Sequence, residues 1–263
     1  MSLLTKPDPL ADWDNMPESH ARIGYNSYIT NGTGSETNKA VLPDTYQRWE
    51  DASGTMTGNF DFATNQTIDY MAIAGHNLFS AGVTQIEFSY STNGGSTVNF
   101  IKSVAPTSDD PIMITFDPIE NVDYVRFFIP NDGSTDREIA VVHAGRALQM
   151  YQPIYGGHSP IRLSAKTTYL NAMSETGNFL GRREKKEGLQ SNFSWRFLDP
   201  TWYRERFHPF VESAKTKPFF IQWRPDKYPE EVVYGWVPSD ISPTNTGGGL
   251  DYMSVGFNVV GHR

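Results

Sequence analysis

Apolar and polar residues alternate along most of this chain, which is the pattern of β-strands with one buried face. In the stretch TQIEFSYS, residues 84–91, Ile86, Phe88 and Tyr90 fall on one face and polar side chains on the other. The stretch TNGGST, residues 92–97, follows directly. Its Asn-Gly-Gly supplies the positive φ that a tight β-hairpin needs, so these residues predict two paired antiparallel strands.

The same alternation recurs near the C-terminus. In the stretch NFSWRF, residues 192–197, Phe193, Trp195 and Phe197 are expected on one face. The last strand is expected to turn a second row of side chains inward: Met253, Val255, Phe257 and Val259. Short strands at this spacing, with almost no helix between them, predict a mainly β protein built from two β-sandwiches.

One segment departs from the strand pattern. Asp199 followed by Pro200 is a helix start, an N-cap acid before proline at the first helical position. A helical apolar face follows, made of Tyr203, Phe207, Phe210, Val211 and Ala214. We expect this amphipathic helix to lie on the strands PFFIQW and NFSWRF, and Pro209 to kink or split it.

Four regions are expected along the chain. Residues 1–40 are predicted to be an irregular N-terminal arm, and residues 41–150 a jelly-roll sandwich. The Pro- and Gly-containing stretch YQPIYGGHSP, residues 151–160, is predicted to be a linker. Residues 161–263 are predicted to form the second β-sandwich, with its helix near residues 200–215.

Charge divides the chain in a similar way. The net charge is −8, but residues 1–150 hold 8 basic and 19 acidic residues (net −11), and residues 151–263 hold 14 and 11 (net +3). An acidic first half argues against a nucleic-acid surface there. The asymmetry indicates two domains with different neighbours, or unselected drift in surface charge.

Catalytic and metal-binding motifs are absent from the sequence. There is no cysteine, no phosphate-binding loop motif and no pair of histidines at metal-ligand spacing. Two carboxylate pairs, Asp12 with Asp14 and Asp109 with Asp110, are expected to be loop acids, although a glycosidase would need such a pair. We therefore expect no enzyme activity and no cofactor; a structural calcium ion is compatible with the acidic loops.

Neither a signal peptide at residues 1–14 nor a membrane-spanning segment is expected. The first residues lack the basic region and apolar core of a signal peptide, and no apolar run approaches the roughly 18 residues of a membrane span.

Residues 41–150 resemble the discoidin-like, galactose-binding-type jelly roll. The resemblance depends on LPDTYQRWE, SYSTNGG and the sequence YVRFFI followed by HAGRAL. It implies glycan binding by loop aromatic and polar groups at one end of the sandwich. The candidate glycan contacts are Tyr46, Trp49, His76 and Asn77, with Trp49 also a candidate core residue.

Residues 159–263 resemble the hub domain of distal tail proteins in long-tailed phages. The resemblance depends on WRFLDP, WYRERF, KPFFIQWRP and VVYGWV. It implies a virion structural protein of the tail tip or baseplate, assembled in the host cytoplasm into a homo-oligomeric ring, most often a hexamer. Such a ring joins the tail tube to the distal tip used for host attachment. Here the galactose-binding-like part precedes the hub-like part, a departure from the commonest arrangement, so its role in binding the host is open.

A basic run, GRREKKEG at residues 181–188, has two interpretations. It is either a solvated hairpin tip or an arm that reaches the acidic half of a neighbouring subunit. The candidate subunit-interface residues are Arg182, Arg183, Lys185, Lys186, Arg204 and Arg206. The sequence thus favours a tail-tip structural protein; the alternatives are a carbohydrate-binding or adhesin module for host surface glycans and, more remotely, a glycan-degrading enzyme.

Overall fold

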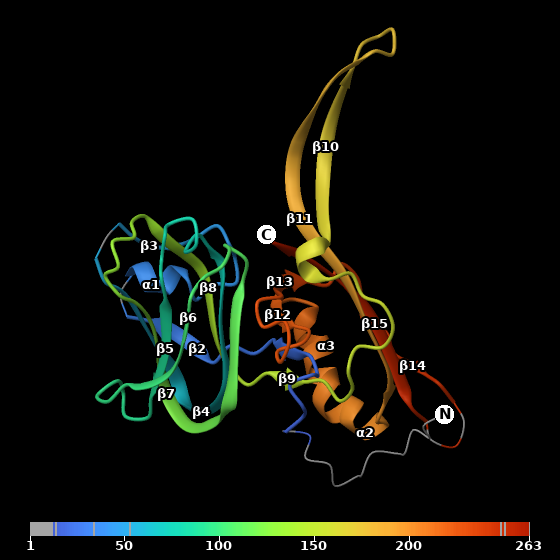
Figure 1. Ribbon diagram of the computed structural model, residues 1–263. Helices are drawn as coiled ribbons and strands as arrows, with labels where there is room; N and C mark the ends of the chain where they lie inside the picture. The colour runs from blue at the N-terminus through green and yellow to red at the C-terminus, as the bar shows by residue number, and fades with distance from the viewer. Residues whose placement is uncertain are drawn as a thin grey trace.

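The computed structural model describes residues 13, 15–33, 35–52, 54–247, 249 and 251–262, with only the backbone described at residues 35, 185–187 and 262. The predicted fold class is confirmed: two antiparallel β-sheets form the protein, and one helical region covers part of the second sheet (Figure 1). Among the described residues no helix has the length and hydropathy to span a membrane.

The first sheet has seven strands and folds over into a jelly roll. Its strands are β2 (Ile29–Gly32), β3 (Trp49–Asp51), β4 (Met56–His76), β5 (Ile86–Ser91), β6 (Asn99–Val104), β7 (Ile112–Ile129) and β8 (Arg137–Gly145). The order is β3-β8-β4-β7-β5-β6, with β2 beside β4 and the short helix α1 (Ser35–Lys39) after β2. Register shifts between Asp61 and Tyr70 bend the long strands β4 and β7, so that each contributes to both layers around one apolar core.

The predicted hairpin between β5 and β6 is confirmed. The two strands pair antiparallel across the TNGGST stretch. Gly94 and Gly95 have φ of 65° and 80°, the left-handed values for which glycine is favoured.

The second sheet has eight strands. They are β1 (Arg22–Gly24), β9 (Leu148–Gln149), β10 (Ala165–Met173), β11 (Phe179–Leu198), β12 (Phe219–Gln222), β13 (Val232–Trp236), β14 (Thr244–Asn245) and β15 (Met253–His262). The order is β10-β11-β15-β13-β12-β1-β9, with β14 beside β15, and a 3₁₀ turn (η1, Ile161–Leu163) precedes β10.

Residues expected in the N-terminal arm are built into both sheets. Strand β1 lies between β12 and β9 in the second sheet, and β2 pairs with β4 in the first. Strand β9, from the end of the predicted first domain, also joins the second sheet. Burial explains this placement, because Ile23 and Leu148 enter the apolar core of the second sheet.

The helical region is one continuous stretch with a π-helical turn in its middle. It comprises α2 (Pro200–Trp202), the π turn η2 (Tyr203–Phe207) and α3 (His208–Ala214). The Asp199 carboxylate caps its start by accepting hydrogen bonds from the backbone N–H groups of Thr201 and Trp202, at 2.8 and 2.9 Å. The interruption expected at Pro209 takes the form of the wider turn, which makes room for a ring that an unbroken α-helix would exclude.

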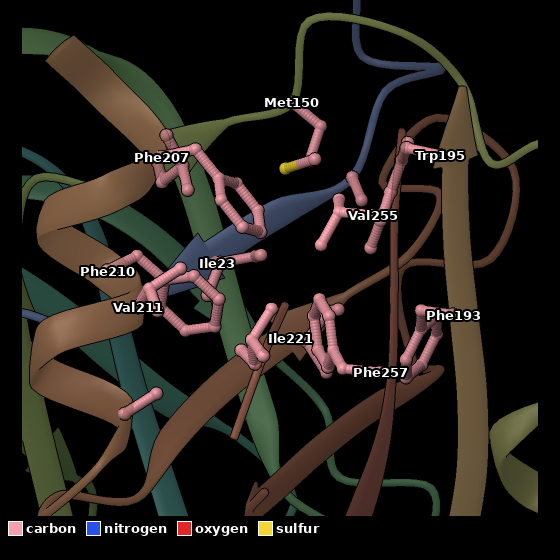
Figure 2. Close-up of a cluster of buried hydrophobic side chains, with 14 of the residues drawn as sticks. Ile23, Met150, Phe193, Trp195, Phe207, Phe210, Val211, Ile221, Val255 and Phe257 are labelled. Carbon is pink, nitrogen blue, oxygen red and sulfur yellow. The ribbon is translucent and has the colours of Figure 1, made fainter. Parts of the chain in front are cut away.

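The predicted helix face is confirmed. Phe207, Phe210 and Val211 point from the helix toward Ile23, Ile221 and Phe257 on the strands (Figure 2). Ring centroids of Phe210 lie 4.9 Å from Phe219 and 5.8 Å from Phe257. The inward row expected on β15 is confirmed in the same core: Met253, Val255, Phe257 and Val259.

One position of the predicted alternation on β11 is wrong. Phe193 and Trp195 are buried as expected, but Phe197 has φ of 60° and lies at an irregularity in the pairing of β11 with β15. Leu198 is buried next to this irregularity, and Phe197 packs on Tyr155 and Tyr252. The left-handed residue shifts the face on which the following side chains emerge.

The two sheets pack against each other through a third apolar cluster. Tyr70, Ala72 and Ala74, on the outer face of β4, meet Phe220 and Tyr234 of the second sheet. The Tyr234 hydroxyl donates to the Pro43 carbonyl at 2.7 Å. This contact explains why residues 70–74 form a continuous apolar run: β4 is buried on both faces here.

Candidate interaction surface

A two-stranded ribbon extends from the second sheet. Strand β10 pairs with residues 179–189 of β11, whereas β11 pairs with β15 only from Leu189 onward. Residues 165–188 therefore form a hairpin whose two edges pair with no other strand of the described residues, and it projects beyond the rest of the molecule (Figure 1). At about 3.3 Å per residue, its nine-residue strand β10 spans roughly 30 Å. We call residues 165–188 the ribbon.

The ribbon carries large apolar side chains that are exposed to solvent. They are Tyr169, Leu170, Met173, Phe179 and Leu180, between 43% and 67% exposed. The pairing places Met173 directly opposite Phe179 near the tip. Soluble proteins rarely gather this much apolar surface on a projecting element, and such patches mark interaction sites.

The local sequence builds the ribbon with a tight turn and two irregularities. Gly177, with φ of 85°, permits a turn in which Ser174 N–H donates to the Asn178 carbonyl at 2.9 Å. Register shifts near Tyr169 and Met173 leave an extra residue in β11 at each place and increase the local twist. An isolated two-stranded ribbon is marginally stable in water, so an exposed one of this length calls for a partner.

The basic run at residues 181–188 is not a hairpin tip. The turn lies at residues 174–178, and the basic run extends along β11. Arg182 and Arg183 are exposed, and the Arg182 guanidinium lies 3.4 Å from the centroid of the Tyr169 ring. The side chains of Lys185 and Lys186 lie outside the described part of the chain. Consecutive strand residues alternate faces, so this run cannot present all its charges on one side.

The two helix arginines lie apart from the ribbon, on the helical region. Arg204 is exposed, and its Nη1 donates to the Pro200 carbonyl at 2.8 Å. Arg206 is half-buried and borders a cavity of about 210 Å³ shared with Trp13 and Tyr25 of the same chain. The structure therefore does not gather the six candidate interface residues into one surface.

The candidate glycan contacts are also divided. Tyr46 is 92% exposed, on a loop held by hydrogen bonds from the Tyr46 and Gln47 N–H groups to the Asp44 carboxylate. Trp49 is 4% exposed and packs in the first core against Phe60, which makes it a structural residue.

His76 and Asn77 are structural residues as well. Burial lowers the pKa of His76 to about 4, so its imidazole is neutral at pH 7. The Asn77 amide bridges two backbone groups, donating to the Asp136 carbonyl and accepting from the Glu138 N–H. Of the four candidates, only Tyr46 presents a side chain that a sugar could cover.

Of the carboxylates suggested by the sequence, Asp109 holds a loop. Asp109 accepts hydrogen bonds from the N–H groups of Phe79 and Ser80, at 2.9 and 3.1 Å. Asp12 and Asp14 lie outside the described residues. Within the described part of the chain, no group of three His, Cys, Asp or Glu side chains is arranged to hold a metal ion.

Sequence reasoning missed the apolar residues of the ribbon. The signal was present in the adjacent pairs Tyr169-Leu170 and Phe179-Leu180. Adjacent residues of a strand point to opposite faces, so each pair makes both faces of the ribbon partly apolar. A strand that is apolar on both faces is either buried in the subunit or covered by a partner.

Comparisons with known proteins found no matching family profile and no matching curated protein. Solved structures with some likeness include chitosan-binding module 1 of a chitosanase/glucanase from Paenibacillus sp. IK-5 (14% identity, 46% of this chain and 97% of that chain, TM-score 0.38). Others are an F5/8 type C domain from Bacteroides fragilis (11%, 53% and 99%, 0.36) and a CBM32 module of a family 31 glycoside hydrolase from Clostridium perfringens (16%, 48% and 93%, 0.34). TM-scores this far below 0.5 carry no argument about what this chain binds.

Proposed function

We propose that this protein is a non-catalytic structural subunit whose copies assemble through the ribbon. The observation that supports this proposal is the ribbon itself: an unpaired two-stranded hairpin with Phe179 and Leu180 exposed near its tip. Covering these side chains on a neighbouring copy would remove apolar surface from water and pair the free strand edges. The expected ring, most often a hexamer in tail-tip hub proteins, is one closed arrangement of such head-to-tail contacts.

Charge complementarity favours a second copy as the occupant of this surface. The ribbon holds five basic and three acidic residues, whereas residues 1–150 have a net charge of −11. A ribbon that reaches the first sheet of its neighbour would bring opposite charges together and fix the direction of docking. In this proposal the protein belongs to a virion tail tip and contacts other tail proteins.

The test replaces apolar ribbon residues by serine: Leu170, Met173, Phe179 and Leu180. Sedimentation velocity at tens of micromolar should find closed oligomers of the wild type and single copies of the variant. Trp236→Ser is the control, because Trp236 is 44% exposed on β13, outside both the ribbon and residues 41–150. A wild-type chain that stays monomeric at tens of micromolar, or a variant that assembles equally well, would refute the proposal.

Glycan binding by the first sheet is a second candidate, supported by Tyr46. The Asp44 turn fixes the backbone from which the exposed Tyr46 ring projects, and an exposed aromatic ring can stack on a sugar. Calorimetric titration with host surface polysaccharides should give binding that Tyr46→Ala removes and Phe79→Ala, at another exposed aromatic, leaves intact. Equal binding by wild type and Tyr46→Ala would reject this site.

A further inference from the structure

A buried carboxylate lies where the two sheets meet. Asp69 belongs to β4, within an otherwise apolar run, and is 3% exposed. Its Oδ1 accepts a hydrogen bond from the Ala147 N–H at 2.7 Å, while Oδ2 has no hydrogen-bond partner among the described residues. A buried carboxylate oxygen without a donor costs free energy and calls for an explanation.

Asp69 borders a large cavity of about 520 Å³. The cavity lies between residues 15–18, the Thr115–Pro118 part of β7 and the connection from β8 to β9. Two more carboxylates, Glu18 and Asp117, line it and are exposed, which places them toward the solvent side. A space of this size exceeds what one or two bridging waters occupy and falls in the range of small-ligand pockets.

The charges in the cavity favour a positively charged occupant. Three carboxylates line the cavity with the guanidinium of Arg22, and Arg146 also acts on Asp69 from nearby. Arg22 uses its Nη1 and Nη2 to donate to the carbonyls of His20 and Met16. Neither bond goes to Asp69, so among the described residues its buried Oδ2 has no donor within hydrogen-bond distance, although the Gln149 side chain lies near the carboxylate.

We propose that this cavity binds an organic cation, an alkylammonium or guanidinium group whose N–H donates to Asp69 Oδ2 while Glu18 and Asp117 attract it at the mouth. Such groups carry several N–H donors and form strong, charge-assisted hydrogen bonds with carboxylates. The cation comes either from a small free molecule or from a basic side chain of a second copy. The first source is independent of the proposed assembly, and the second requires contact between copies.

Binding depends on the ionisation of Asp69. Burial raises the pKa of this carboxyl to about 6, and the Ala147 N–H, Arg146, Arg22 and Gln149 oppose the shift. Two tyrosines, Tyr28 and Tyr70, lie near the same carboxylate. At pH 5 only about a tenth of the carboxyl groups are ionised, so affinity for a cation should fall roughly tenfold between pH 8 and pH 5.

The probe is agmatine, which carries one guanidinium and one ammonium group, measured by titration calorimetry at pH 8 with neutral butylurea as the control ligand. The wild type should bind agmatine and should not bind butylurea. Asp69→Asn should weaken binding at least tenfold and Asp117→Asn severalfold, while Asp61→Asn, on β4 but outside the cavity, should bind like the wild type. Equal affinities for wild type and Asp69→Asn, or no binding by wild type, would overturn the proposal.

Two further measurements complete the design. If Asp69→Asn does not fold, the agmatine affinity of Asp117→Asn and the agmatine affinity of the wild type between pH 8 and pH 5 test the proposal instead. The proposal is overturned if neither the substitution nor the change of pH alters the affinity. Agmatine added to assembled wild-type protein identifies the source: dispersal assigns the cation to a side chain of a second copy, and unchanged assembly assigns it to a free molecule. Either result supports the site, provided that agmatine binds.

Discussion

Phe193 and Phe179 lie on the same strand, β11, in opposite surroundings. Phe193 is 1% exposed in the aromatic core beneath the helix, whereas Phe179 is 64% exposed on the ribbon. The difference arises where β15 ends its pairing with β11 at Leu189. Beyond that residue the strand keeps its apolar side chains, but no second layer of the described residues covers them. A single strand thus serves a domain core at one end and, in our account, a contact between copies at the other.

The largest expected difference in stability is between the alanine variants of these two phenylalanines. Phe193→Ala should lower the free energy of unfolding by about 3–5 kcal/mol, because it opens a cavity in the core. Phe179→Ala should change it by less than about 0.5 kcal/mol in the dissociated subunit. Urea unfolding at submicromolar concentration measures both. Similar losses for the two variants would show that the ribbon packs within its own subunit.

The free energy of unfolding should depend on pH through three buried groups, Asp69, His76 and His143. The pKa of Asp69 is about 6 when folded, above its usual 3.8. The folded chain therefore binds more protons between these values, and the stability contributed by Asp69 rises as the pH falls from about 6 to 4. For His143 and His76, burial lowers the folded pKa to about 4, so their contribution is lost as the pH falls from 6.5 to 4.

Asp69→Asn isolates the carboxylate from the histidines. The change in the free energy of unfolding that the substitution causes should be more favourable at pH 7 than at pH 4, by on the order of 1–3 kcal/mol. Urea unfolding of wild type and variant across pH 4–7 measures this difference. A pH-independent difference would show that Asp69 titrates normally.

Packing around Trp49 gives a medium effect in the first sheet. A Cβ at Gly58 would overlap the Trp49 indole ring and Phe60, so Gly58→Ala should cost about 1–3 kcal/mol. Gly256→Ala is the matched control, since the nearest atom to its Cβ would lie 3.6 Å away. Thermal unfolding compares the two, and a loss at Gly256 as large as that at Gly58 would contradict the packing described for Trp49.

The smallest expected effect is at the helix cap. Asp199→Ala removes the acceptor for two backbone N–H groups and should cost about 1 kcal/mol, while Asp199→Asn keeps an acceptor and should cost less. Urea unfolding resolves the pair. An alanine variant as stable as the wild type would mean that solvent satisfies the helix start equally well.

Local patterns predicted much of the fold. Strand alternation, the Asn-Gly-Gly turn, the Asp199-Pro200 helix start and the apolar helix face depend on neighbouring residues alone, and each is present. Long-range pairing was out of reach: nothing local indicates that β1 inserts between β12 and β9. The left-handed Phe197 was missed because phenylalanine seldom adopts positive φ.

The candidate sites were less accessible to sequence reasoning. Whether Trp49 lies in a core or on a surface, and whether a basic run is a turn or a strand, depends on contacts that the sequence does not encode locally. The unpaired oxygen of Asp69 depends on three segments far apart in the chain.

The most direct test of the account is a photo-crosslinking measurement at Phe179. A benzoylphenylalanine placed there and irradiated at tens of micromolar protein should form chain-to-chain adducts, with peptides of residues 41–150 of a second copy as the partner. The same probe at Trp236, which is exposed on β13 outside both the ribbon and residues 41–150, should give few adducts. A Phe179 probe that links only within its own chain, or not at all, would contradict assembly through the ribbon.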